Sequence, residues 1–143
     1  MKHIFTLLFF CASALTWSGC SEKEEDPQFD PQDLLGKWEA YQEYLGDTEE
    51  FIPYDQNRDI LDIGPNTITA TIHGYDDNDH LQVTILKLTY TLNGDMLTGE
   101  DEDGEVYSFR IEVLTQTEFV YSYESYSPEH GAFRNKTYHR RIG

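Results

Sequence analysis

The feature that most constrains this chain is a two-residue alternation of apolar and polar side chains, which recurs from residue 34 almost to the C-terminus. In residues 67–73, isoleucine or alanine occupies every second position, and threonine or histidine occupies the others. This period puts apolar side chains on one face of an extended strand, whereas a helix needs a period of about 3.6 residues. The alternation therefore predicts an all-β fold.

Breaks in the alternation divide the chain into about eight predicted strands. Asn93-Gly94 predicts a tight hairpin, because both residue types tolerate positive φ, whereas residues 49–59 are expected to form mostly loop. Short turns between consecutive strands favour an antiparallel up-and-down barrel, with a two-sheet sandwich as the alternative. The strands are expected at residues 34–44, 60–63, 67–73, 81–92, 96–99, 106–114, 118–126 and 133–142.

Two strands make specific predictions about which side chains face inward. In residues 81–92 the apolar phase changes, with Leu81, Val83 and Ile85 on one face and an apolar set from Leu86 onward on the other. A β-bulge or a sharp bend between Ile85 and Leu86 would restore one continuous inner face, and strongly bent strands suit a small closed barrel. In residues 106–114, one face is expected to carry Tyr107, Phe109, Ile111 and Val113.

The N-terminal residues have the organisation of a secretory leader. Residues 4–15 are almost continuously apolar, yet this run is too short for a membrane-spanning helix, which takes about 20 residues. Small residues stand at 18–19, directly before Cys20, and this stretch resembles a bacterial lipoprotein signal. The resemblance predicts a leader at residues 1–19 and lipidation of Cys20 with palmitate as a membrane anchor; the alternative is an ordinary secretory signal.

An acidic run at residues 21–26 follows Cys20. It resembles the surface-export signal of Bacteroidetes lipoproteins, which implies an outer-membrane location facing the cell exterior. It also has the composition of a solvated tether, because like charges keep a linker extended. We therefore expect residues 20–32 to form the lipidated cysteine and tether, and residues 33–143 to form one small domain.

Charge and cysteine content exclude several functions for the chain. There are 27 acidic and 10 basic residues, for a formal net charge of −17, so phosphate backbones and anionic lipid surfaces would repel it. We accordingly expect no nucleic-acid partner. Because Cys11 would leave with the leader and Cys20 would carry lipid, no thiol remains for a disulfide, a thiolate metal site or a nucleophile. The domain must then be held together by core burial and strand pairing.

Three motifs in order resemble the lipocalin superfamily over residues 34–142. They are Gly36-Lys37-Trp38 and two hairpin segments, at residues 90–97 and 111–119, that resemble repeating hairpins in lipocalin-like domains of Bacteroidetes lipoproteins. The resemblance implies a lipocalin-like barrel in which Trp38 closes the base. It further implies that Arg140 or Arg141 packs on that ring as a cation–π contact, worth ~0.5–2 kcal/mol. The alternative is that both arginines are ordinary surface residues.

No residue pattern identifies a metal, cofactor or catalytic site. Asp55, Asn57 and Asp59 have the spacing that begins a calcium loop, but Ile60 and Asn66 stand where glycine and glutamate are needed. Residues 76–79 and 100–105 form two further acidic turns, and solvated tips are the expected structure for all three. The histidines outside the leader show no zinc-pair spacing; they are His73, His80, His130 and His139.

Aromatic side chains on the strands are the remaining candidates for a binding function. If the barrel interior is not full, they would line a pocket for a small hydrophobic ligand, although a filled core is the simpler expectation for so short a chain. The leading hypothesis is therefore a non-enzymatic, lipid-anchored binding protein. The alternatives are a structural or interaction subunit with a filled barrel, and a hydrolase using paired carboxylates. The candidate ligand-binding residues are Tyr90, Tyr107, Phe109, Phe119, Tyr121 and Tyr123.

Overall fold

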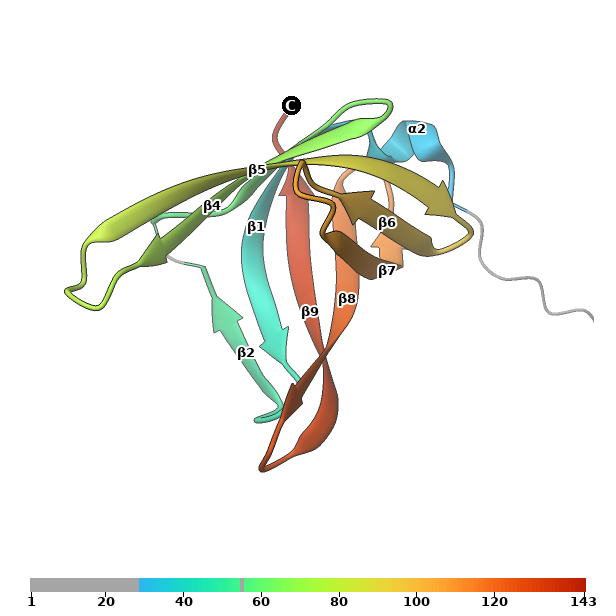
Figure 1. The fold of residues 1–143 in the computed structure, drawn as a ribbon. Helices are drawn as coiled ribbons and strands as arrows, with labels where there is room; N and C mark the ends of the chain where they lie inside the picture. The colour runs from blue at the N-terminus through green and yellow to red at the C-terminus, as the bar shows by residue number, and fades with distance from the viewer. Residues whose placement is uncertain (1–28, 55) are drawn as a thin grey trace, which may run out of the picture.

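A computed structural model describes residues 29–54 and 56–143 (Figure 1). These residues form one short helix, α2 (Pro31–Leu34), and nine strands in a single sheet. Cys20, the leader and the acidic run lie outside the described residues. Among the residues described, no helix is long and apolar enough to cross a membrane. The strands are β1 (Gly36–Leu45), β2 (Glu50–Pro53), β3 (Ile60–Ile63), β4 (Thr67–Tyr75), β5 (Leu81–Asn93), β6 (Met96–Glu100), β7 (Val106–Leu114), β8 (Glu118–Ser127) and β9 (Gly131–Arg141).

The sheet closes into a barrel because β1 pairs with β9 as well as with β3. The short strand β2 pairs only with the second half of β1, so the other eight strands make up the barrel. The predicted antiparallel up-and-down barrel is thus confirmed, and the sandwich is wrong. The prediction that residues 49–59 are mostly loop is confirmed for the described residues outside β2. In β2, Phe51 packs its ring 4.9 Å from that of Tyr44.

Two β-bulges change which side chains face the interior. In β1 the register with β9 shifts between Ala40 and Gln42, so that Glu43 pairs with the buried Thr137. In β7 the register with β8 shifts between Ile111 and Val113. Leu114 packs against the core in place of Val113. The prediction that Val113 shares a face with Ile111 is therefore wrong, because a bulge inserts one extra residue into the alternation.

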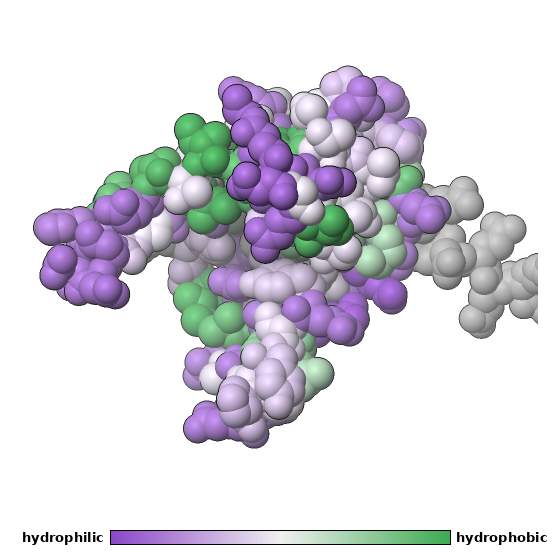
Figure 2. Space-filling model, viewed as in Figure 1, coloured by the Kyte–Doolittle hydropathy of each residue, from purple (hydrophilic) through white to green (hydrophobic). Residues whose placement is uncertain are grey.

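The predicted bulge between Ile85 and Leu86 is wrong. Pairing of β4 with β5 runs without interruption from Tyr75–Leu81 to Thr67–Thr89, so Leu81, Val83 and Ile85 all point outward. β3 accompanies β4 only as far as Thr71, and beyond it the β4–β5 hairpin projects from the barrel (Figure 1). Apolar residues are visible along this hairpin, between its hydrophilic tip and the barrel (Figure 2). The exposed apolar side chains on its outer face belong to Tyr75, Leu81, Val83 and Ile85.

The base of the barrel is built around Trp38, which is fully buried. Its indole N–H donates to the carbonyl oxygen of Leu34 in α2 at 2.8 Å, so the helix is fixed across the barrel end. Phe29 also packs against the core, and the folded body therefore begins before the predicted boundary at residue 33. The core consists of Leu34, Trp38, Ile63, Ile68, Leu88, Tyr90, Leu97, Ile111 and Phe119.

Arg141, and not Arg140, lies over the Trp38 ring, with its Cζ 4.3 Å from the ring centroid. The Arg141 guanidinium also donates to the carbonyl oxygens of Leu35 and Asp33 at 2.6 Å each, and to that of Gln116. This approach needs a glycine at Gly36, where a Cβ would collide with the guanidinium and φ is +124°. The adjacent Arg140 pairs instead with Glu39 at 2.9 Å.

Candidate ligand-binding cavity

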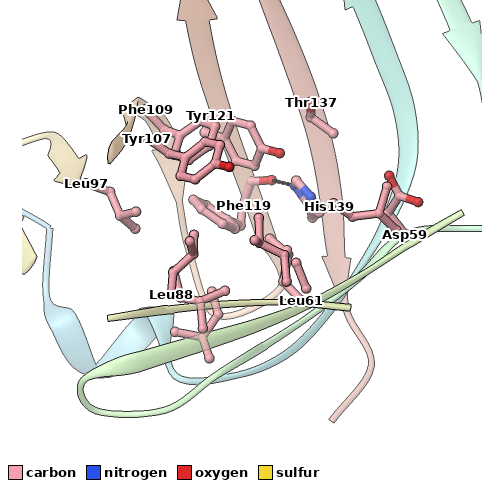
Figure 3. A pocket seen from close by; sticks show the side chains of 15 residues that line it. Asp59, Leu61, Leu88, Leu97, Tyr107, Phe109, Phe119, Tyr121, Thr137 and His139 are labelled. Atoms are coloured by element: carbon pink, nitrogen blue, oxygen red, sulfur yellow. Dashed lines mark hydrogen bonds between the residues drawn. The ribbon is translucent and has the colours of Figure 1, made fainter. Parts of the chain in front are cut away.

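The barrel interior holds a cavity of about 120 Å³ (Figure 3). Engineered cavities of about 150 Å³ lined by Leu, Ile and Phe stay dry and bind benzene. The space here therefore suits a single ring or a short alkyl chain. The lining residues come from β3 to β9 together with Asp59, which directly precedes β3: Asp59, Leu61, Ile63, Ile68, Ala70, Ile72, Leu86, Leu88, Leu97, Tyr107, Phe109, Phe119, Tyr121, Thr137 and His139.

Aliphatic side chains form one end of the cavity. They come from alternate positions of β3, β4 and β5, which is why the two-residue period gathers them on one surface. Ala70 of β4 pairs with Leu61 of β3 and Leu86 of β5. Its methyl group therefore stands between two larger side chains, and the short Ala70 side chain leaves room in the cavity wall.

An aromatic wall covers another side of the cavity, and four of the six predicted candidates form it. Phe109 lies 4.7 Å from Tyr121, ring centre to ring centre, and Phe119 lies 5.6 Å from it. Tyr107 is the fourth member. In Figure 3 the rings of Tyr107, Phe109 and Tyr121 lie above Leu88 and Leu61. Tilted contacts of this kind are favoured by the quadrupole of aromatic rings.

The structure places the other two predicted candidates outside the cavity lining. Tyr90 is a core residue whose hydroxyl donates to the carbonyl oxygen of Gly64 at 2.8 Å. Tyr123 donates its hydroxyl to Glu43 at 3.0 Å. Strand alternation correctly puts both side chains inside the barrel, but it carries no information about how far along the barrel each one lies.

The polar side of the cavity is set by the bulge in β1. There the backbone N–H of Ala40 donates to the carbonyl oxygen of Asp59 at 2.9 Å, and the N–H of Tyr54 donates to that of Tyr41 at 3.0 Å. These bonds hold the segment between β2 and β3 against β1. Asp59 thereby reaches the cavity edge, at the opposite end from Leu97 in Figure 3.

The Asp59 carboxylate is anchored but not saturated. One oxygen accepts the backbone N–H of His73 at 2.7 Å and also lies 3.8 Å from His73 Nδ1. The other accepts a long hydrogen bond from the Tyr54 hydroxyl at 3.5 Å. An ionised carboxylate offers about four acceptor positions, and the side chain is 21% exposed. Asp59 can therefore accept a further hydrogen bond from a bound molecule.

His139 sits in the cavity wall as a neutral ring. It is 1% exposed, and its Nδ1 lies 3.2 Å from the carbonyl oxygen of Phe119. Burial lowers the pKa of His139 to about 4, so the imidazole is uncharged at neutral pH. Sequence reasoning did not single out this residue. Its position two residues after Thr137, in a strand whose odd positions face inward, is the only signal that could have done so.

The tyrosines near the polar side keep their protons. Burial raises the pKa of Tyr121, and the carboxylates of Asp59 and Glu43 act in the same direction. Burial and the same two carboxylates also raise the pKa of Tyr54. Among the described residues that line the cavity, there is no lysine or arginine. At neutral pH the cavity therefore combines an apolar interior, neutral hydroxyl groups and the negative charge of Asp59.

The remaining sequence candidates for metal binding are dispersed. Within residues 29–54 and 56–143, no group of three or more His, Asp or Glu side chains is arranged to hold a metal ion. Asp55 of the calcium-like motif lies outside the described residues, and Asn57 donates its amide to the Tyr75 hydroxyl. In the turn of the β4–β5 hairpin, Asp76 accepts backbone N–H groups from Asn78 and His80.

A family model for the lipocalin-like domain matches residues 34–121, while no curated protein matches the chain. A lipocalin-like protein from Bacteroides uniformis has 15% identity and a TM-score of 0.53, over 77% of this chain and 99% of its own. An uncharacterized protein from Bacteroides eggerthii has 12% identity and a TM-score of 0.50, over 76% of this chain and 98% of its own. Bovine odorant-binding protein, in complex with its natural ligand, has 14% identity and a TM-score of 0.50, over 84% of this chain and 78% of its own.

At these identities the structural neighbours establish a shared barrel architecture, whereas the family model rests on the sequence itself. That model covers more than half of the chain, including Trp38 and most of the strands. The protein therefore belongs to the lipocalin-like domain family.

Proposed function

We propose that this protein is a lipid-anchored binding protein at the bacterial cell surface, whose barrel holds a small hydrophobic molecule without transforming it. The observation that carries the binding function is the cavity of about 120 Å³, with its aliphatic and aromatic walls. The lipocalin-like family and the likeness to an odorant-binding protein with its ligand support it. A cavity of about 120 Å³ restricts the ligand to a small molecule.

The binding function is tested by filling the cavity from one wall. Ala70→Leu adds three carbon atoms on the cavity side of β4, whereas Thr71→Leu adds apolar bulk at the next residue, on the opposite face. With 2-phenylethanol as the probe in isothermal titration calorimetry, we expect Ala70→Leu to weaken binding at least about tenfold, because the ring and the new side chain compete for one space. Thr71→Leu should bind as the native chain does.

Circular dichroism of both variants separates lost binding from lost folding. If the Ala70→Leu chain is folded and still binds 2-phenylethanol with native affinity, the probe occupies another place and the cavity is not the binding site. Mass spectrometry of the native protein, purified without detergent exchange, then identifies any molecule carried from the cell.

The anchor and location rest on sequence features alone. The leader, the small residues before Cys20 and the acidic run at 21–26 support lipidation and outward display on the outer membrane. Cys20→Ala should abolish labelling by radioactive palmitate and release the protein from the membrane fraction. A Cys20→Ala chain that stays membrane-bound would refute the anchor. Protease digestion of intact cells tests outward display, since only an exposed domain is degraded.

A second function, an interaction subunit of an outer-membrane complex, is favoured by the exposed apolar face of the β4–β5 hairpin. Exposed apolar patches on soluble domains often mark interaction sites. Ile85 is 62% exposed and Val83 is 53% exposed. Photo-crosslinking from position 83 in cells should then capture one defined protein, and an absence of any specific adduct would count against this function.

A further inference from the structure

The cavity described above has a polarity that restricts which small molecules it accepts. Its aliphatic end and its aromatic wall are largely apolar. Its polar side is formed by Asp59, Thr137 and His139. His139 is neutral, because burial holds its pKa at about 4. Among the described residues that line the cavity, Asp59 is the only one with a carboxylate. A ligand buried here meets this carboxylate, and none of the described lining residues is a lysine or an arginine.

Neighbouring groups reinforce this negative potential. Glu43 follows the β1 bulge and pairs with Thr137, which lines the cavity. Glu43 accepts the hydroxyl of Tyr123 at 3.0 Å. The nearest arginine in sequence, Arg58, pairs with Glu39 at 3.2 Å, and Arg140 pairs with the same carboxylate. Both arginines thus have a carboxylate partner, and neither lines the cavity.

Asp59 also has the geometry of an acceptor for a ligand. Its two partners, the His73 N–H and the Tyr54 hydroxyl, leave acceptor positions unused. The Asp59 carboxylate lies at one end of the cavity lining, and the apolar Leu97 lies at the other (Figure 3). If the ring of a ligand occupies the cavity, a polar group joined to that ring through one or two carbon atoms would point toward Asp59.

From this arrangement we infer that the cavity selects a small amphipathic amine, with its ring or short alkyl chain in the apolar interior and its ammonium group hydrogen-bonded to Asp59. The inference rests on the proposed binding function and names its ligand class. A charge-assisted hydrogen bond to a partly buried carboxylate is about twice as strong as a neutral one. An anionic ligand of the same shape would face the carboxylate and be repelled.

The test compares three probes that share one ring: 2-phenylethylamine, 2-phenylethanol and phenylacetate. Each is titrated calorimetrically at pH 7.5 into the full-length chain in zwitterionic phosphatidylcholine nanodiscs, with empty nanodiscs as the blank. We expect the amine to bind about tenfold more tightly than the alcohol, and phenylacetate to bind weakest. Asp59→Asn keeps an oxygen that can accept the His73 N–H and removes the charge. It should lower amine affinity about tenfold and leave alcohol affinity within about twofold.

Asp62→Asn is the matched control, because it removes the same charge from β3 at an exposed position that pairs only loosely with Lys37 at 4.0 Å. It should leave all three affinities unchanged. If the alcohol binds and the amine binds no better, or if Asp59→Asn keeps the preference for the amine, the inference is overturned while the binding function stands. If none of the three probes binds the native chain, the binding function itself is overturned and this inference with it.

Discussion

Replacing Arg141 tests how the barrel is closed at its base. Its guanidinium stacks on Trp38 and joins three chain segments through the carbonyl oxygens of Asp33, Leu35 and Gln116. Arg141→Ala removes the cation–π contact, worth ~1 kcal/mol. It also removes two partly buried charged hydrogen bonds, worth ~1 kcal/mol each after water replaces part of them. The bond to Gln116 is exposed and adds little.

The expected loss is therefore about 3 kcal/mol of the free energy of unfolding, measured by urea denaturation followed by tryptophan fluorescence. Arg141→Lys should recover less than half of this loss, because an ammonium group cannot reach three carbonyls at once or stack as a planar fork. For a domain of this size, the loss lowers the melting temperature by roughly 12 °C.

The neighbouring Arg140→Ala provides the matched control. Arg140 is 55% exposed and pairs with Glu39, which also pairs with Arg58, and exposed ion pairs contribute ~0–1 kcal/mol. If the two alanine variants lose the same stability within ~0.5 kcal/mol, the network seen at Arg141 does not close the barrel and the reasoning is refuted.

Two further predictions concern His139 and Gly94. The pKa of His139 is about 4 in the folded protein against 6.5 in an ordinary histidine, so only the unfolded chain takes up the proton between these values. The free energy of unfolding should therefore fall by ~3 kcal/mol as the pH drops from about 6.5 to 4. Urea titrations of His139→Gln should lack this part of the pH dependence. An unchanged pH profile in this variant would contradict the prediction. Gly94 has a φ of +65° in the β5–β6 turn, so Gly94→Ala should cost ~1 kcal/mol. Gly74→Ala, at an open strand position with nothing within 4 Å, should be neutral or slightly stabilising by calorimetry.

The inward orientation of Trp38 can be predicted from its neighbours in the sequence. Gly36 and Trp38 share one face of a strand by simple alternation, and the family resemblance supplied the role of the ring. The sequence does not distinguish Arg140 from Arg141 in this role, because the distinction depends on which face of β9 points toward the barrel base. Pairing of β9 with β1 decides it, placing Arg141 opposite Trp38.

The errors arose where the alternation is interrupted or leaves the barrel. The apolar side chains of Leu81, Val83 and Ile85 predicted a bulge, yet they point outward on a hairpin that extends past the ends of the neighbouring strands β3 and β6. Val113 was expected inside, yet the bulge in β7 puts Leu114 there. Both cases depend on pairing with a neighbouring strand, which alternation within one strand does not report.

By itself, the sequence determined the all-β class of the fold, the approximate positions of the eight barrel strands and the aromatic residues available to the interior, because these follow from side-chain alternation and turn chemistry within short segments. Only the tertiary structure decided that the barrel keeps a small cavity and that Asp59 and His139 reach it. Asp59 is held there by hydrogen bonds to a bulge distant in sequence. Such placements arise when distant segments pack together, and the volume left between them is a property of all the walls at once.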